Sequence, residues 1–188
     1  MIRLVKMNRS HLSWVMQQRN RPELIKYFRQ TNPIQFSQQV DWWDRLNHKN
    51  VNLYLVHNNQ SEYVGYVALN PIDPRHKHAE FGVFIVPEHQ NKGYAQEAML
   101  EILSIGFNGL GLNKIYSDVL DYPGEGRFEF YKKLGFREEG RLKQHYLKDG
   151  KWIDAIQFAM LADEYKKNQS RLEPRNKESA NTKVEVLG

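Results

Sequence analysis

The stretch from residue 86 to residue 99, VPEHQNKGYAQEAM, holds the residues best placed to do chemistry. An apolar run at 79–86 precedes it, and a segment with helical spacing, about 93–107, follows. A tight turn from a strand into a helix leaves several main-chain N–H groups pointing outward, and together with the helix dipole they attract an anion. Gly93 lets an anion approach the main chain and Lys92 adds a positive charge, which suits a pyrophosphate. On spacing alone, a glycine at this place also fits an ordinary turn.

Composition limits the classes of protein that this chain can belong to. Its 188 residues suit a single domain, and 40% of them are hydrophobic, which is enough for a core. Because the chain has no cysteine, disulfides, a thiolate nucleophile and cysteine-ligated zinc are excluded. The net charge of +5 favours a polyanionic partner such as a phosphorylated cofactor, and a basic surface without specific meaning is the alternative.

The sequence shows no sign of export or of membrane insertion. The N-terminal MIRLVKMNRSHLSW lacks a long apolar region, and no apolar run approaches the length of a membrane span. We therefore expect a cytoplasmic protein without a membrane partner.

The elements that must position the 86–99 stretch follow from the periodicity of the apolar residues. Apolar and alternating runs predict strands at 1–7, 51–57, 62–69, 79–86 and 113–120. Helical spacing predicts helices at 10–19, 22–28, 38–49, 93–107 and 126–135, with Ser37 as the N-cap of the third. Asp149–Gly150 predicts the turn of a closing hairpin. This order predicts an α+β fold with a mixed central sheet and one clear parallel crossover, from strand 79–86 to strand 113–120.

The polar character of the chain changes near residue 166. We assign residues 1–165 to one domain, and expect residues 166–188, which are polar and basic, to form a flexible tail because they cannot bury enough apolar area to fold alone. In the third predicted helix, Trp43 shares a face with apolar neighbours and is predicted to be core. Trp42 points elsewhere and is the freer candidate for stacking on a ligand.

Several motifs together resemble one known family. Gln90–Asn91–Lys92–Gly93–Tyr94–Ala95 resembles the Q/R-x-x-G-x-G/A acetyl-CoA motif of the GCN5-related N-acetyltransferases (GNAT). Residues 79–95 as a whole resemble that family's fourth strand and pyrophosphate loop, and FYKKLGF (130–136) resembles its late helix. The hairpin at 138–161 is similar to the RimJ/RimL-type branch, and the pattern at 17–46 to amino-sugar nucleotide N-acetyltransferases of the pseudaminic-acid pathway. The resemblance covers residues 1 to about 165.

The resemblance implies a fold and a co-substrate. The fold would be a three-layer α/β/α sandwich whose sheet splays open between the fourth and fifth strands, with acetyl-CoA wedged in the gap. A main-chain N–H near Val86 would stabilise the thioester oxygen as it becomes an oxyanion. The implied cofactor-binding residues are Phe84, Ile85, Val86, Gln90, Asn91, Lys92, Gly93, Tyr94, Ala95, Gly124 and Tyr131.

The same resemblance implies direct attack of an amine on the thioester. Such a transfer needs a base for the ammonium proton and an acid for the leaving sulfur. Tyr131 stands where the family commonly keeps its acid tyrosine, and packing in the core or against CoA is the alternative. Glu80 is the candidate base, directly or through water, and a solvated strand-end glutamate or a substrate anchor is the alternative.

Other polar residues are weaker candidates for the acceptor side. An anionic acceptor could be contacted by Arg29, together with Arg19 and Arg21. It could also be contacted by the 75–78 loop, through His76 and His78. No metal is expected, because no acidic partner was found at a suitable spacing from the two histidines. His145 is a second candidate base, for which an exposed strand histidine is the alternative.

One position departs from the family pattern. Counting back from Tyr131, the place that often holds an asparagine is occupied by Gly124, within DYPGEGRFEFY. The usual asparagine contact with the CoA arm is therefore in doubt.

Alternative functions remain open at this stage. The leading acceptors are an amino sugar on a nucleotide and a protein N-terminal amine, followed by a small amine. A non-catalytic acyl-CoA-binding protein is one alternative. Another is a ribosome-associated or nucleic-acid-binding protein that uses the basic residues of the tail, Lys166, Lys167, Arg171, Arg175 and Lys177. Acidic residues reduce the positive charge of that tail, so nucleic acid is not the expected partner. A homodimer is compatible with the sequence.

Overall fold

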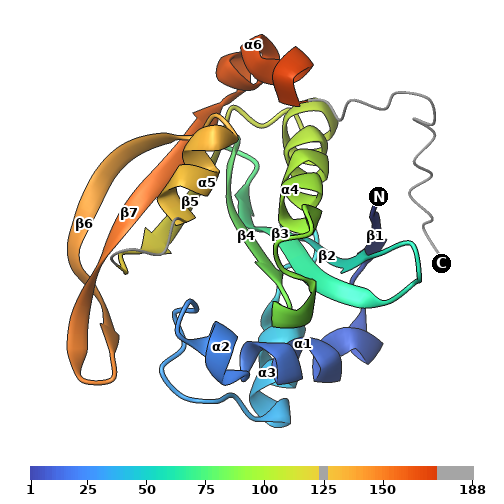
Figure 1. Cartoon of the computed structure of the whole chain (residues 1–188), viewed down its shortest axis with the longest axis vertical. Coiled ribbons are helices and arrows are strands. Elements are labelled where there is room, and N and C mark those ends of the chain that lie inside the picture. The colour runs from blue at the N-terminus through green and yellow to red at the C-terminus, as the bar shows by residue number, and fades with distance from the viewer. Residues whose placement is uncertain (123–126, 173–188) are drawn as a thin grey trace.

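The protein contains one seven-stranded mixed sheet with helices on both faces, in the order β1-β2-β3-β4-β5-β7-β6 (Figure 1). It is known from a computed structural model, which describes residues 1–122 and 127–172. The strands are β1 (Arg3–Lys6), β2 (Asn52–His57), β3 (Tyr63–Asp73), β4 (His78–Ile85), β5 (Lys114–Leu120), β6 (Arg137–Lys148) and β7 (Lys151–Leu161). The α-helices are α1 (Leu12–Arg19), α2 (Pro22–Ile25), α3 (Phe36–Arg45), α4 (Tyr94–Ser104), α5 (Arg127–Lys133) and α6 (Ala162–Leu172). Short helical turns are η1 (Arg9–His11), η2 (Pro87–His89) and η3 (Ile105–Gly109). The predicted α+β fold is confirmed.

The sheet opens between its fourth and fifth strands. β4 and β5 are the parallel pair, and they are in register only at His78↔Lys114, Ala79↔Ile115 and Glu80↔Tyr116. Beyond Glu80 the two strands diverge, so that β1–β4 lie on one side of the gap and β5, β7 and β6 on the other (Figure 1). The implied splay is therefore present, and it leaves the edge of β4 without a strand partner toward Ile85.

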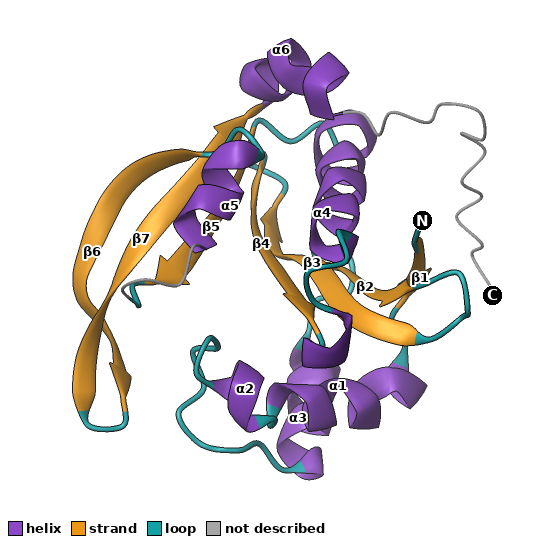
Figure 2. Cartoon of the chain, viewed as in Figure 1, coloured by secondary structure: helices purple, strands orange, loops and turns teal. Residues whose placement is uncertain are grey.

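The two faces of the sheet pack against different helices. Side chains alternate along a strand, so neighbouring residues of β3 enter different clusters. Val67 and Leu69 belong to the larger core cluster, which includes the buried face of α4, whereas Ala68 belongs to a second cluster with Leu12 and Val15 of α1. Figure 2 shows α1, α2 and α3 grouped apart from α4 and α5. The gap between β4 and β5 consequently has an α1–α3 side and an α4–α5 side.

Local sequence explains most element boundaries, although several differ from the prediction: α2 ends at Ile25 rather than at residue 28, and α3 ends at Arg45 rather than at residue 49. Pro22 stands in the first turn of α2, and Asp149 and Gly150 have φ of 50° and 73°, which suits a two-residue hairpin turn. The predicted N-cap of α3, Ser37, is wrong: Gln35 is the N-cap, and it forms a reciprocal capping box with Gln38. β3 is also longer than predicted, because it continues past Leu69 through a register shift to Asp73.

The C-terminal boundary lies within a helix. α6 spans Ala162–Leu172 and so crosses the division predicted at residue 165, with Tyr165 buried against Phe107. Residues 173–188, which include the predicted basic positions Arg175 and Lys177, lie outside the described residues. In the described part of the chain, no helix has both the length and the apolar character needed to cross a membrane.

Candidate active site

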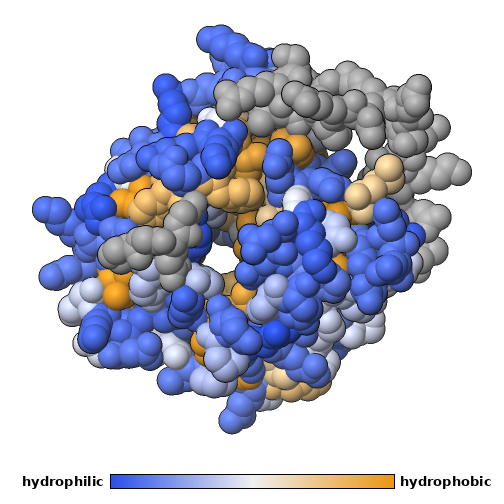
Figure 3. Space-filling model, viewed as in Figure 1, coloured by the Kyte–Doolittle hydropathy of each residue, from blue (hydrophilic) through white to orange (hydrophobic). Residues whose placement is uncertain are grey.

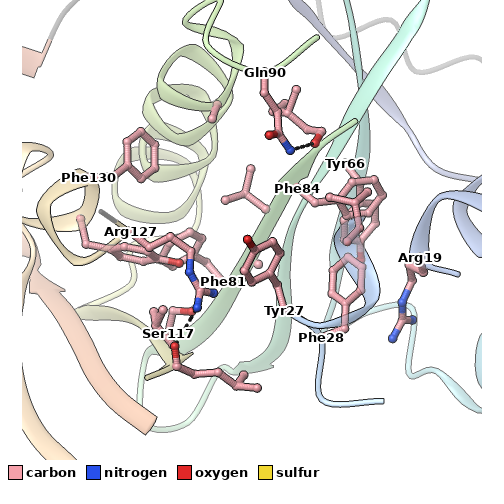
Figure 4. Close-up of a pocket in the computed structure, with 18 of the residues that line it drawn as sticks. Arg19, Tyr27, Phe28, Tyr66, Phe81, Phe84, Gln90, Ser117, Arg127 and Phe130 are labelled. Carbon is pink, nitrogen blue, oxygen red and sulfur yellow. Dashed lines mark hydrogen bonds between the residues drawn. The ribbon is translucent and has the colours of Figure 1, made fainter. Parts of the chain in front are cut away.

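A cavity of about 800 Å³ occupies the gap between β4 and β5. The space-filling view shows the corresponding hollow near the middle of the molecule (Figure 3). Residues from α1, the loop after α2, β3, β4, the turn before α4, β5 and α5 line it (Figure 4). The cavity brings together most of the site residues expected from the sequence: Arg29, Glu80, Phe84, Ile85, Gln90, Asn91, Gly93, Tyr94, Ala95 and Tyr131.

Several expected site residues do not line this cavity. Val86 is buried and is not among the lining residues, and Lys92 is exposed outside the cavity. His76, His78 and His145 are also absent from its walls. Gly124 lies outside the described residues.

The turn at one end of the cavity has the geometry expected of an anion site. Gly93 is the N-cap of α4 and has φ of 84°, a left-handed conformation that favours glycine. A Cβ added at Gly93 would meet nothing within 4 Å, so the space in front of this main chain is open. The Gln90 side chain donates to the main-chain oxygen of Ile85 at 2.9 Å and ties the turn to β4 (Figure 4). The first N–H groups of α4, which have no partner within the helix, therefore face an open space.

The oxyanion donor expected near Val86 is not Val86 itself. The Val86 N–H donates to the main-chain oxygen of Val64 in β3 at 3.0 Å, so it is already used. Successive N–H groups along a strand point to opposite sides. Those of Ile85 and Val83 consequently point toward the gap, and they are the donors that β4 offers there.

Tyr131 forms part of the wall on the α4–α5 side. Its ring stacks on Phe158 at 5.2 Å and contacts Phe81 at 5.6 Å, while it also lines the cavity. Burial raises the pKa of Tyr131, and a hydrogen bond with Ser117 opposes this rise. The phenol is therefore protonated at neutral pH and has a proton to give.

Glu80 lies on the opposite side of the gap, in an ion pair. Arg29, from the loop after α2, donates from Nη1 to Glu80 Oε2 at 3.2 Å and from Nη2 to the other carboxylate oxygen. Asp118 of β5 lies 3.9 Å from the same guanidinium. Burial raises the pKa of Glu80; Arg29 opposes this rise and Asp118 adds to it. A carboxylate with a raised pKa is better able to accept a proton near neutral pH.

The cavity also contains residues that the sequence analysis did not select. Tyr27, Tyr66, Ser117, Asp118 and Arg127 all line it. Arg127 donates to the main-chain oxygen of Leu120 at 2.8 Å and lies 4.4 Å from the ring centre of Tyr27. Polar residues in the middle of the apolar strand at 113–120 were the available signal for Ser117 and Asp118.

The histidines expected on the acceptor side lie on the surface. His145 is exposed on β6, and only its neighbour Tyr146 approaches the site, with Arg29 at 5.4 Å from its ring centre. Asp73 is the acidic neighbour that the sequence analysis did not connect with His76 and His78: the three offer ligand atoms within 4.8 Å of one another. Asp73 already accepts from the N–H groups of Arg75 and His76, so its carboxylate also serves to close this turn.

The family model described as an acetyltransferase (GNAT) domain matches residues 2–137. The chain belongs to the GNAT acetyltransferase family. Spermidine N(1)-acetyltransferase of Escherichia coli K12 is 30% identical over 164 residues, which covers 87% of this chain and 88% of that protein. The corresponding Vibrio cholerae protein is 28% identical over 160 residues, or 85% of this chain and 92% of that protein.

Solved GNAT structures agree with the family assignment. Spermidine N-acetyltransferase from Vibrio cholerae, crystallised with CoA and spermine, superposes with a TM-score of 0.81 at 26% identity and covers 87% of this chain and 97% of that one. The chain is thus an acetyl-CoA-dependent N-acetyltransferase, and acetyl-CoA is its co-substrate. These similar proteins are named for spermidine, whereas the sequence favoured the RimJ/RimL and amino-sugar branches.

Proposed function

We propose that this protein transfers the acetyl group of acetyl-CoA directly to a primary amine that enters from the α1–α3 side of the sheet. The observation that carries the proposal is the gap between β4 and β5. It has an open helix start at Gly93 at one end, and Glu80 and Tyr131 in its walls. Because Glu80 and Tyr131 lie on different sides of the sheet, the amine and the leaving sulfur can each meet a separate proton-transfer group.

Binding of the co-substrate is assigned to the turn and to the edge of β4. The N–H groups at the start of α4 would hold the pyrophosphate, because they are unpaired and the helix dipole favours negative charge. Phe84 and Ile85 would lie along the pantetheine arm, and the N–H groups of Val83 and Ile85 face the place where charge develops on the thioester oxygen. Lys92, exposed beside this turn, would add long-range attraction for the polyanion.

Proton transfer is assigned to Glu80 and Tyr131. The Glu80 carboxylate accepts a proton from the acceptor's ammonium group, directly or through water, and the resulting neutral amine nitrogen forms the new bond to the thioester carbon. As the carbon–sulfur bond breaks, the Tyr131 hydroxyl supplies the proton that the thiolate takes. Burial is the first cause of a raised pKa in both groups. For Glu80 the raised pKa favours acceptance of a proton, and for Tyr131 it keeps the phenol protonated until the basic thiolate leaves.

The acceptor that we propose is an amino sugar carried on a nucleotide, with a protein N-terminal amine as the alternative. Support comes from the positive charges on the acceptor side: Arg19 ends α1, Arg21 precedes α2, and Arg29 stands in the loop after α2. Polyamine acetylation is the second candidate, because relatives of this length and similarity are named for spermidine. For a polyamine, Glu80 and Asp118 would be the attracting carboxylates, but both already face Arg29.

Calorimetric titration of acetyl-CoA tests the first step. We expect micromolar binding to the wild-type protein and none to Gly93→Glu. Gly111→Glu is the matched control, since Gly111 also has a positive φ, of 62°, and also has open space where a Cβ would stand, but lies outside the cavity. If both variants lost acetyl-CoA binding equally, backbone strain introduced by the glutamate, rather than damage to the anion site, would explain the loss. Absence of binding to the wild-type protein would overturn the proposal.

An amine panel then tests the acceptor. Turnover of acetyl-CoA is compared with a nucleotide-linked amino sugar, a peptide with a free N-terminus, and spermidine. A higher kcat/KM for spermidine than for the first two would select the second candidate.

A further inference from the structure

Arg19 is a cationic side chain at the edge of the cavity, and it has no anionic partner among the residues that the structure describes. It is the last residue of α1, and its guanidinium lies 5.4 Å from the ring centre of Phe28 and beside Tyr66 (Figure 4). Among the residues that the structure describes, no carboxylate or other acceptor receives a hydrogen bond from this guanidinium. Two nearby arginines differ: Arg21 donates to Glu88 at 2.8 Å and Arg29 is paired with Glu80.

The surroundings of Arg19 make this isolation costly. Burial lowers the pKa of Arg19, although the group remains protonated at any physiological pH. A guanidinium has five N–H donors, and the half-buried Arg19 side chain loses part of its hydration without gaining a protein acceptor in exchange. The carboxyl end of α1 offsets part of the charge, because the helix dipole is negative there, but it does not supply the missing acceptors. An oxyanion entering the cavity would supply them.

We infer that Arg19 binds an oxyanion, a phosphate or a carboxylate, that the acceptor carries at a distance from its amine. This inference rests on the proposed function and narrows its substrate class. Phe28, Tyr66 and Trp42 line the cavity with Arg19 and form an aromatic wall beside the anion. Such a wall excludes water and would strengthen the interaction between the guanidinium and the anion.

The register of the sheet separates Arg19 from the ion pair of Arg29 and Glu80. Tyr66, beside Arg19, is opposite Phe84, and Glu80 lies four residues before Phe84 on β4. At about 3.3 Å per residue, the main chain at Phe84 and at Glu80 is separated by about 13 Å. Arg19 and the Arg29–Glu80 pair are therefore distinct parts of the acceptor side.

The same arrangement disfavours a polycation. A polyamine would bring a second positive charge to Arg19, where no carboxylate is available in the described residues to neutralise either. We therefore expect the chain to discriminate against spermidine through this residue.

Kinetics with matched acceptors test the inference. The variants are Arg19→Met, Arg19→Lys and, as the control, Arg9→Met, because Arg9 pairs with Asp44 at 61% side-chain exposure and lies outside the cavity. We expect Arg19→Met to lower kcat/KM for a nucleotide-linked amino sugar at least tenfold, mainly through KM, and to leave or raise kcat/KM for spermidine. Arg19→Lys should recover part of the loss. A loss of the same size for both acceptors, or none for the phosphate-bearing one, would overturn the inference.

A binding measurement separates this inference from the proposed function. The CoA-saturated protein is titrated with uridine diphosphate and, separately, with glutarate, so that phosphate and carboxylate are compared and no turnover is needed. We expect at least one probe to bind the wild type and Arg9→Met and to bind Arg19→Met at least tenfold more weakly. If this holds while no amine is acetylated, the proposed function fails and the anion subsite stands. If amines are acetylated and neither probe depends on Arg19, the subsite fails alone.

Discussion

The ammonium group of Lys148 lies 2.6 Å from the main-chain oxygen of Phe28, although the two residues are 120 positions apart in the chain. It also donates to the main-chain oxygen of Ile25 at 2.8 Å, and Lys148 is only 4% exposed. The tip of the β6–β7 hairpin thereby holds the loop after α2. That loop carries Tyr27, Phe28 and Arg29 into the cavity, so the hairpin fixes the acceptor side from a distance.

Lys148→Met should loosen this loop. Because several carbonyl groups lose a charged donor, we expect a loss of about 1–3 kcal/mol in the free energy of unfolding. The KM for the amine should rise severalfold, whereas acetyl-CoA affinity should not change. Denaturant titration and steady-state kinetics measure these effects, with Lys151→Met as the control, since Lys151 is the exposed partner of Lys148 in the hairpin register. Equal behaviour of the two variants would show that the contact does not position the loop.

Tyr131→Phe tests the proposed acid. The substitution keeps the ring contacts with Phe158 and Phe81 and removes only the hydroxyl. We expect kcat to fall by about 10²–10⁴-fold, the range for a general acid, while the dissociation constant of acetyl-CoA changes less than threefold. Tyr63→Phe, on an exposed tyrosine outside the cavity, is the control. Unchanged kcat in Tyr131→Phe would remove the tyrosine from the mechanism and leave it a packing role.

The pH dependence of kcat/KM tests the proposed base. A base must be deprotonated, so activity should fall as pH falls through the pKa of Glu80, which burial raises above its usual 4.5. Arg29→Met removes the charge that opposes the rise, and should move this acid limb to higher pH. Asp118→Asn removes a negative charge that adds to the rise, and should move the limb to lower pH. Glu80→Gln should abolish the limb together with most of the activity, and a limb that persists in Glu80→Gln would belong to another group.

Gly65→Ala should destabilise the strand pair that forms one wall of the cavity. A Cβ at Gly65 would stand 2.4 Å from the main-chain oxygen of Phe84, a contact that only a shift of β3 or β4 can relieve. We expect a loss of about 1–3 kcal/mol, typical of overpacking. Gly140→Ala is the control, because a Cβ there meets nothing within 4 Å. Thermal unfolding of both variants measures the difference, and equal midpoints would show that the sheet adjusts without strain.

The parts of the fold that the sequence predicted are those governed by neighbouring residues. The turn around Gly93 and the hairpin turn at Asp149–Gly150 each depend on a local positive φ, and both were found in their predicted places. The N-cap of α3 was mispredicted because Gln35 is an uncommon cap, and its reciprocal bond with Gln38 outweighed the usual preference for serine. Trp42 lines the cavity while Trp43 does not, as expected, but both also pack against the second core cluster.

The parts of the site that sequence could not predict depend on pairings across the fold. Arg29 meets Glu80 from 51 positions away, and this contact decides the charge of the proposed base. Whether Arg19 is paired cannot be known before its neighbours are placed, although its presence near an acceptor site was anticipated. Which N–H groups near the end of β4 are free likewise depends on strand register. The N–H of Val86, for example, already donates to the main-chain oxygen of Val64.

The unpaired edge of β4 has a consequence for the stability of the protein as well as for its chemistry. Between Glu80 and Ile85 the edge of β4 that faces β5 has no strand partner. The amide groups of the pantetheine arm can complete that edge as a missing strand would. The free energy of unfolding should then rise with the concentration of acetyl-CoA. The increase is about 2.7 kcal/mol when that concentration is one hundred times the dissociation constant. The amide hydrogens of Val83 and Ile85 should exchange with solvent faster in the free protein than in the acetyl-CoA complex. In a cell with little acetyl-CoA, the enzyme would therefore be less stable against unfolding.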